Sequence, residues 1–247
     1  MNAYINLTAE NISDEHICCA IGDPKHNSGV IMKKQWLSER IAQGHVFRKL
    51  DARGKIFIEY APLESAWVPV GGAGYMYIYC LWVAGSFKGK GYASELLEYA
   101  INDSKDKGKS GICTLSSKKK KPFLLEKSFF THYGFSVADS VGEYELLSFS
   151  WYGTQPHFND CVRSMEIDTN IFTVYYSPEC PYVLNSIKEL EEYASDSGIP
   201  FNAVKIDSLE KAKSVPCVFN NWANFKNGKF ISNTILNKNS FEKLLNK

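Results

Sequence analysis

The stretch from Tyr75 to Ala93 constrains the fold of this chain more than any other. Residues 75–83 are apolar at every position, which predicts a central β-strand covered on both faces. The strand runs into the glycine-rich segment 85–91. Residues 91–107 then carry an apolar stripe at helical spacing. The chain therefore passes from a buried strand through a glycine-rich turn into a helix.

A glycine-rich turn ahead of a helix is suited to binding an anion. Glycine lets a ligand approach the backbone, and the first helical turn offers free N–H groups and the positive end of the helix dipole. Lys88 and Lys90 add positive charge. A pyrophosphate site is one interpretation, and a plain turn with two solvated lysines is the other. The spacing fits neither a Walker loop nor a Rossmann fingerprint, since Gly89, Gly91 and Ser94 lack the third glycine.

The segment Lys88-Gly89-Lys90-Gly91-Tyr92-Ala93 resembles the Q/R-x-x-G-x-G/A motif of the GNAT N-acetyltransferases. His132-Tyr133-Gly134-Phe135 is similar to the Gly-Phe that follows the last core helix of that family. The resemblance covers residues 1–150 and implies the GNAT acyl-CoA N-acyltransferase fold. It also implies that acetyl-CoA is the co-substrate. The backbone of Trp82 and Val83 would hold its pantetheine arm, and Lys88, Gly89, Lys90, Gly91, Tyr92 and Ala93 would hold its pyrophosphate.

The resemblance further implies that an amine attacks the thioester directly, with backbone N–H groups stabilising the oxyanion. Two positions depart from the family pattern, because Phe130 stands where the family places a catalytic Tyr and Phe123 stands near its Asn. Tyr133 is a candidate substitute for the missing acid, or a buried aromatic side chain. Glu59 is a candidate base with a raised pKa, or a surface carboxylate on an edge strand.

Four consecutive lysines, at positions 118–121, follow a predicted strand at the same edge of the sheet as the glycine-rich turn. They would contact the phosphates of CoA, attract an acidic substrate, or form a solvated loop. This lysine run, the segment 15–19 (which includes Cys18 and Cys19) and the segment 54–60 resemble the YoaP-like branch of the GNAT family. That branch carries a second domain.

The C-terminal part of the chain resembles a thioredoxin-like domain. Ser177-Pro178-Glu179-Cys180-Pro181-Tyr182-Val183 is similar to the C-P-Y-C turn of glutaredoxins, with Val183 in place of the second cysteine. Val215-Pro216-Cys217-Val218 is similar to the cis-proline segment that faces that turn. We therefore expect a β-α-β-β-β-α unit in which the Val215–Pro216 bond is cis and Cys180 and Cys217 face one another. Cys180 should have a lowered pKa at a helix start that has Pro181 as its first residue. Such a unit would be either a thiol site or a redox-inactive docking domain.

Periodicity and turn residues predict the remaining elements. In the first part, strands are expected at 4–7, 45–50, 55–61, 111–116, 135–138 and 144–149, and helices at 33–43 and 122–132. In the second part, strands are expected at 172–176, 201–206, 218–219 and 229–232, and helices at 181–195 and 240–245. The predicted organisation is an α+β GNAT domain over residues 1–150, a linker over 151–169, and a smaller α/β thioredoxin-like domain over 170–247.

The composition excludes several classes of protein. A net charge of +1 favours neither nucleic acid nor an anionic membrane, and no apolar run approaches the ~20 residues that span a bilayer. Seven cysteines do not suggest a secreted disulfide framework, so we expect a cytoplasmic protein without a metal site.

The leading hypothesis is an N-acetyltransferase that acts on a primary amine of a small molecule or peptide. One alternative is a protein that binds acyl-CoA or senses thiols with little or no acetyl turnover. A thiol-redox protein that acts through Cys180 is disfavoured by the absent C-x-x-C motif.

Overall fold

The computed structural model describes residues 3–17, 19–219 and 221–246. Cys18 therefore lies outside the described residues. The chain divides into two compact units. The first contains residues Met1–Ile21, Leu37–Ala66 and Val70–Asn159, and the second contains Gly22–Trp36, Trp67–Pro69 and Asp160–Lys247. The predicted linker over 151–169 thus belongs partly to each unit, and residues 22–36 group with the C-terminal part of the chain rather than with the first domain.

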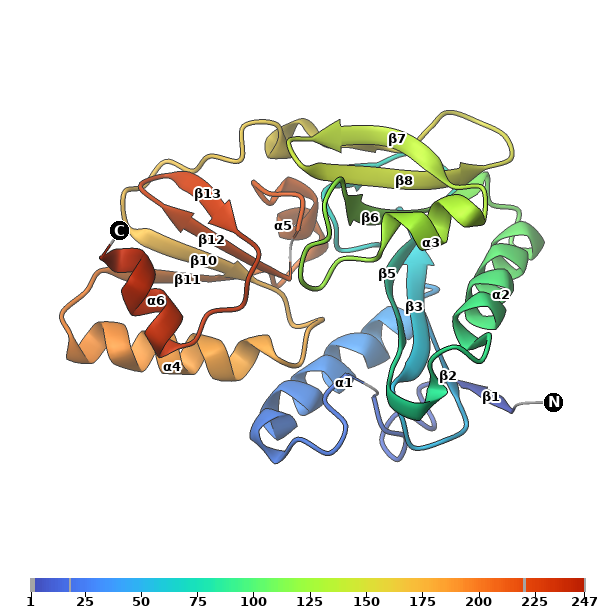
Figure 1. Cartoon of the computed structure of the whole chain (residues 1–247), viewed down its shortest axis with the longest axis horizontal. Coiled ribbons are helices and arrows are strands. Elements are labelled where there is room, and N and C mark those ends of the chain that lie inside the picture. The colour runs from blue at the N-terminus through green and yellow to red at the C-terminus, as the bar shows by residue number, and fades with distance from the viewer. Residues whose placement is uncertain (1–2, 18, 220, 247) are drawn as a thin grey trace. The chain divides into compact units, whose positions relative to one another are not determined.

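A seven-stranded sheet in the order β1-β2-β3-β5-β6-β8-β7 forms the centre of the first unit (Figure 1). The strands are β1 Tyr4–Asn6, β2 Val46–Leu50, β3 Ile56–Pro62, β5 Tyr75–Val83, β6 Gly111–Ser117, β7 Ser136–Val141 and β8 Tyr144–Ser150. Neighbouring strands are antiparallel except for β5 and β6, which are parallel. Two short strands that were not predicted, β4 (Val70–Gly71) and β9 (His157–Phe158), pair with each other. The seven predicted strands of this part all form, within a few residues at their ends.

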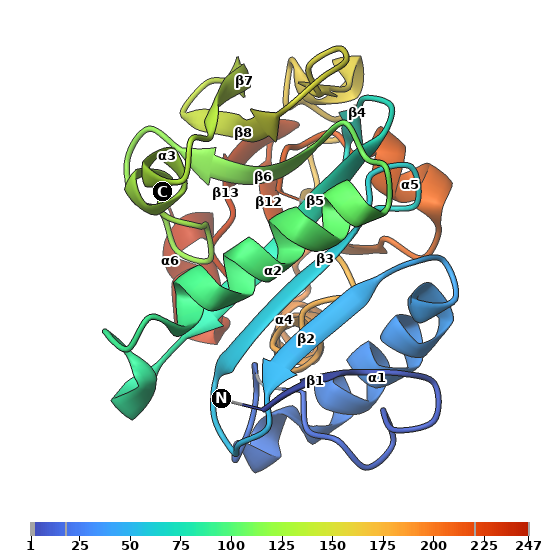
Figure 2. The same cartoon turned by 90° about the vertical axis from the view of Figure 1, so that its right-hand side faces the viewer.

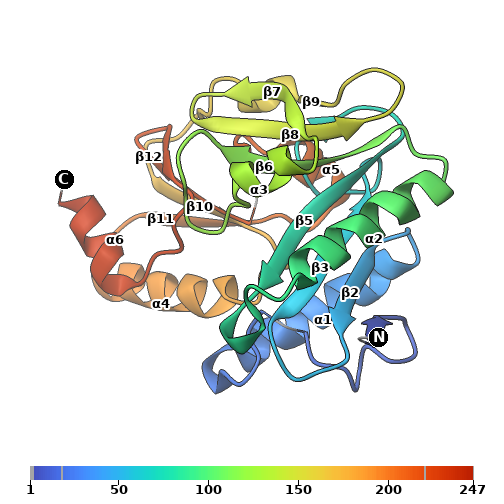
Figure 3. The ribbon, with the colours of Figure 1, turned by 45° about the vertical axis from the view of Figure 1, so that its right-hand side comes forward.

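Helix α2 (Tyr92–Asp106) lies along one face of this sheet, over β3 and β5 (Figures 2 and 3). Its apolar stripe explains the position, because Leu96, Leu97, Ala100 and Ile101 are buried in one core with side chains of β3 and β5. The short helix α3 (Lys127–His132) contributes Phe130 to the same core. This core fixes the position of the turn that precedes α2.

Two predicted helices of the N-terminal part have different starting points. Helix α1 spans Asn27–Ile41 and begins six residues before the predicted start, directly after the 3₁₀ turn η1 (Pro24–His26). Helix α3 begins at Lys127 instead of residue 122. Phe123 has a φ of 64°, which an α-helix does not accommodate, so the prediction for residues 122–126 was wrong.

The second unit is built on a four-stranded sheet in the order β11-β10-β12-β13 (Figure 1). Its elements are β10 Phe172–Tyr176, α4 Val183–Asp196, β11 Phe201–Lys205, α5 Leu209–Ser214, β12 Trp222–Lys226, β13 Lys229–Ser232 and α6 Lys238–Leu245. The strands β10 and β11 are parallel, whereas β12 is antiparallel to both β10 and β13. Helices α4 and α6 pack on one face of the sheet, where Val183, Ile187, Leu190, Ala194 and Phe241 share a core with Phe172, Val174 and Trp222.

The expected β-α-β-β-β-α order is present, with the additional helix α5 between β11 and β12. Three details of the prediction were wrong. The Val215–Pro216 bond is trans, the isomer that X–Pro bonds favour. The strand expected at residues 218–219 forms further along the chain, as β12 at Trp222–Lys226. Helix α4 was expected to begin at Pro181 but begins two residues later, at Val183. The order of the strands supports a thioredoxin-like fold for this unit. The assignment stays a prediction, because the cis-proline expected of that fold is absent.

Within the described ranges, no helix combines the length and apolar character that crossing a membrane requires.

Candidate active site

Strands β5 and β6 run together for four residues and then separate. They pair from Tyr75 with Gly111 to Ile78 with Thr114, and the hydroxyl of Thr114 donates to the carbonyl oxygen of Ile78 at 2.9 Å. Beyond this point β5 continues only with β3, and β6 continues only with β8 (Figure 2). The facing edges of the two strands are left unpaired with each other, and an extended ligand can use such an edge for backbone hydrogen bonds.

The separation begins at a β-bulge in β5. Glu59 of β3 is opposite Cys80, but the next residue, Tyr60, is opposite Ile78, so Tyr79 is the extra residue. A bulge bends its strand and increases the local twist, which directs the end of β5 away from β6. The splay also corrects the prediction that β5 is covered on both faces throughout. Its first four residues are buried and its last five, including Trp82 and Val83, are half-buried.

The turn between β5 and α2 keeps its backbone open. Gly89 and Gly91 have φ values of 72° and 84°, a region that favours glycine, and a Cβ on either would have no neighbouring atom within 4 Å. Gly91 is the N-cap of α2 and provides no side-chain hydrogen bond to the first helical turn. Lys88 and Lys90 are exposed on both sides of Gly89. The turn therefore presents backbone N–H groups and two cations to an anionic ligand.

The remaining two residues of the predicted loop anchor it to the core. Tyr92 and Ala93 are half-buried in the first turn of α2. The ring of Tyr92 packs edge-on against Phe87, with 5.9 Å between centroids. Lys55 lies at the tip of the β2–β3 hairpin, and its Nζ is 4.7 Å from the ring centroid of Trp82.

Phe130, which stands at the position of the family's acid, and Tyr133, the candidate substitute, lie in or against the core. Phe130 is 1% exposed, and its ring packs against Phe135 at 5.1 Å. Tyr133 is the C-cap of α3, and its ring lies 5.2 Å from that of Phe129. Phe123 is 56% exposed in the segment before α3. The position that would hold the family's tyrosine is therefore occupied by a core phenylalanine.

Glu59 lies in the interior of the sheet, so the alternative of a surface carboxylate on an edge strand was wrong. Its side chain is fully buried, and Oε1 lies 3.0 Å from Nε2 of His45, whose side chain is 2% exposed. The imidazole of His45 stacks on the ring of Tyr79, the bulge residue, with 5.1 Å between centroids. Sequence reasoning proposed Glu59 but missed His45.

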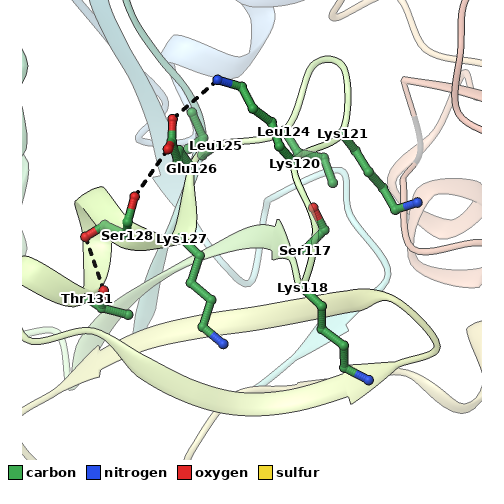
Figure 4. A pocket seen from close by; sticks show the side chains of 10 residues that line it. All are labelled: Ser117, Lys118, Lys120, Lys121, Leu124, Leu125, Glu126, Lys127, Ser128 and Thr131. Carbon is green, nitrogen blue, oxygen red and sulfur yellow. Dashed lines mark hydrogen bonds and ion pairs between the residues drawn. The ribbon is translucent and has the colours of Figure 1, made fainter.

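A lysine-lined pocket of about 390 Å³ lies between the segment after β6 and helix α3 (Figure 4). It is lined by Ser117, Lys118, Lys120, Lys121, Leu124, Leu125, Glu126, Lys127, Ser128 and Thr131. Lys120 pairs with Glu126 at 3.5 Å, and Lys127 pairs with Glu145 of β8 at 2.8 Å. The lining of the pocket has a net positive charge, because it contains four lysines and one glutamate. Contact with CoA phosphates or with an acidic substrate both stay predictions.

The two cysteines of the predicted thiol site have different environments. Cys180 is half-buried three residues before the start of α4. Cys217 is fully buried, and its thiol donates to the carbonyl oxygen of Phe219 at 3.4 Å. Burial raises the pKa of the Cys217 thiol well above its ordinary range, so this side chain stays protonated and unreactive at neutral pH. That the two sulfurs face one another stays a prediction.

No group of three or more His, Cys, Asp or Glu side chains with metal-binding geometry occurs in the part of the chain that the structure describes.

Comparison with known proteins defines the class. Residues 12–125 match the acetyltransferase (GNAT) family, and residues 200–243 match the YoaP-like family. The chain is 39% identical to the uncharacterized N-acetyltransferase YoaP of Bacillus subtilis, over 98% of each chain. The protein therefore belongs to the GNAT acetyltransferases, in their YoaP-like branch, and the expected GNAT fold and YoaP-like relationship are confirmed.

Solved structures of the same family are more distant. The PaiA N-acetyltransferase of Thermoplasma acidophilum, solved with coenzyme A, is 17% identical with a TM-score of 0.43, covering 60% of this chain and 99% of its own. A GNAT acetyltransferase of Brucella melitensis, solved with acetyl-CoA, is 9% identical with a TM-score of 0.40, covering 64% and 95%.

Proposed function

We propose that this chain transfers an acetyl group from acetyl-CoA to a primary amine of a small molecule or peptide. The observation that carries the proposal is the combination of the splay between β5 and β6 with the open glycine turn at the start of α2. An extended arm ending in a pyrophosphate fits both features at once. The names of the relatives support the same activity.

In the proposed complex, the pyrophosphate binds at the turn formed by Lys88, Gly89, Lys90, Gly91, Tyr92 and Ala93. The pantetheine arm pairs with the exposed edge of β5 at Trp82 and Val83, which directs the thioester toward the bulge. The amine attacks the carbonyl carbon directly, backbone N–H groups of β5 stabilise the oxyanion, and the CoA thiolate leaves. The proton of the amine is removed by the buried carboxylate Glu59 or by His45, with which it is paired.

The pyrophosphate assignment is tested by Gly91→Glu, which places a side chain and a negative charge where the phosphates would lie. The matched control is Gly108→Glu, which has a similar φ (65° against 84°) and open surroundings but lies beyond the other end of α2. Both variants carry the cost of a side chain at positive φ, roughly 1–2 kcal/mol. Calorimetry with acetyl-CoA should detect no binding to Gly91→Glu and unchanged affinity for Gly108→Glu. Unchanged affinity in Gly91→Glu would refute the assignment.

A second candidate function is an acyl-CoA-binding or thiol-sensing protein with little turnover. The observation that favours it is Phe130, whose core packing leaves no hydroxyl at the position of the family's acid. The two functions differ in one measurement, because only the enzyme releases CoA in proportion to acetylated amine.

The second unit is proposed to be thioredoxin-like and to act as a docking element rather than a redox site. The order of its sheet supports the fold, and the raised pKa of the buried Cys217 thiol disfavours dithiol chemistry.

A further inference from the structure

His45 and Glu59 form a buried pair beside the bulge of β5. Their side chains are 2% and 0% exposed, and Nε2 of His45 lies 3.0 Å from Oε1 of Glu59. Phe47 and Phe57, which lie on the same face of β2 and β3, are also fully buried and stack on each other. A carboxylate in such apolar surroundings is stable only when it is paired and hydrogen-bonded.

The pairing determines which ring nitrogen of His45 can take up a proton. With Glu59 ionised, its carboxylate only accepts hydrogen bonds, and Nε2 of His45 then carries the hydrogen that it donates to Glu59. In that tautomer Nδ1 holds the basic lone pair. The arrangement is that of a base oriented by a carboxylate, in which the carboxylate fixes the ring and stabilises the imidazolium without taking the proton itself.

We propose that His45 is the proton acceptor for the attacking amine and that Glu59 is its positioning residue. This inference rests on the proposed function and changes the role of Glu59 within it. Nδ1 takes one proton from the acceptor ammonium, directly or through one water molecule, which leaves the neutral amine. The amine nitrogen then forms the bond to the carbonyl carbon as the carbon–sulfur bond breaks. Its second proton goes to the CoA thiolate, and the imidazolium releases its proton to solvent.

The location of the pair fits this role. The imidazole stacks on Tyr79, the residue that forms the bulge, and Glu59 is paired across the sheet with Cys80. The thioester is directed to the same bulge in the proposed complex.

Other titratable side chains lie on the strands next to His45. Tyr77 and Tyr79 of β5 pack against each other at 5.2 Å. Lys49 of β2 points to the same face as Phe47 but is engaged by Glu15, at 2.8 Å. The carboxylate of Glu59 is in direct contact with the imidazole, and it favours the imidazolium that the step produces.

The test compares two nucleophiles with the full-length chain. A primary alkylamine, chosen as the best acceptor from a panel, is an ammonium ion at neutral pH and needs a base. Hydroxylamine is largely unprotonated there and needs none. His45→Gln should lower the rate with the alkylamine by about 100-fold or more, the usual contribution of a general base, and change the rate with hydroxylamine less than about threefold. The matched control is His157→Gln, which replaces an exposed histidine on β9 and should alter neither rate.

Glu59→Gln provides a second variant if His45→Gln does not fold. It should shift the limb of the pH–rate profile that belongs to the imidazole, while acetyl-CoA binding measured by calorimetry stays unchanged. Equal losses with both nucleophiles, or no loss with either, overturn the inference and leave the proposed function intact. A wild-type chain that transfers to neither nucleophile contradicts the proposed function, and the inference with it.

Discussion

Two turns in this chain, one after β5 and one after β10, connect a strand to a helix and differ in what occupies the space ahead of the helix. The turn after β5 contains Gly85, Gly89 and Gly91, all with positive φ, and a Cβ at any of them would meet nothing within 4 Å. The turn after β10 contains Ser177 and Glu179, which are 0% and 3% exposed. The first turn leaves its backbone accessible to a ligand, whereas side chains fill the second.

The difference shows that a turn before a helix is not by itself a binding site. A free helix start becomes available to an anion only where the preceding residues carry no side chains and the helix has no side-chain cap. Helices α2 and α4 both start without a side-chain cap, so the two turns differ in the residues that precede the helix. In the second turn these residues carry buried side chains, and the backbone N–H of Glu179 donates to the hydroxyl of Ser177 at 3.2 Å. We therefore expect substitutions to affect ligand binding at the first turn and folding at the second.

The largest expected effect on stability is that of Val183→Asp, which puts a charge at the first residue of α4, a fully buried position. The unpaired carboxylate should lower the free energy of unfolding by on the order of 4 kcal/mol, measured by denaturant unfolding. Val137→Asp is the control, because Val137 is 44% exposed on β7 and should cost less than about 0.5 kcal/mol. A cost below about 1 kcal/mol for Val183→Asp would mean that side chains do not hold the second turn closed.

A smaller effect is expected from the buried thiol of the second unit. Burial raises the pKa of Cys217 above its ordinary value of 9.0, so above this pH the folded chain keeps a proton that the unfolded chain loses. Stability is then unaffected below about pH 9 and falls as the pH rises beyond it, by up to about 1.4 kcal/mol per pH unit.

The measurement is the free energy of unfolding of wild type and Cys217→Ala between about pH 8 and pH 10. Cys217→Ala should lose the part of the decline that belongs to this thiol and should run parallel to wild type at lower pH. Identical slopes for the two proteins above about pH 9 would show that Cys217 ionises in the folded state, and would reopen a thiol function.

Sequence patterns predicted the strand-to-helix succession well, because local chemistry determines it. The continuous apolar run at Tyr75–Val83 predicts a buried strand, and the apolar stripe at helical spacing predicts the helix α2. The start of α3 was not predictable in this way, because the left-handed conformation of Phe123 is an unusual choice for a bulky residue.

The His45–Glu59 pair escaped prediction because strand register depends on the length of a turn. Had residues 51–54 alone formed the turn, Val46 would lie opposite Glu59. The observed partner is Phe47, one residue further along. A shift of one residue moves every side chain of β2 to the other face of the sheet, so the face that His45 occupies was not determined by the hydrophobic pattern.

The smallest expected effect is that of Tyr133→Phe, which removes the phenolic hydroxyl that was considered as a substitute for the missing acid at Phe130 of α3. The open turn and the splayed strands favour catalysis by positioning, and the leaving CoA thiolate has a pKa near 8.5, so it departs without a proton donor. Tyr133 packs against Phe129 and His132, contacts that a phenylalanine preserves. The variant should therefore keep most of its rate of acetyl transfer, as should Tyr152→Phe, a control at a 56% exposed tyrosine. A loss of about 1000-fold in Tyr133→Phe alone, equivalent to about 4 kcal/mol of barrier, would show that Tyr133 has taken over the role that Phe130 cannot perform.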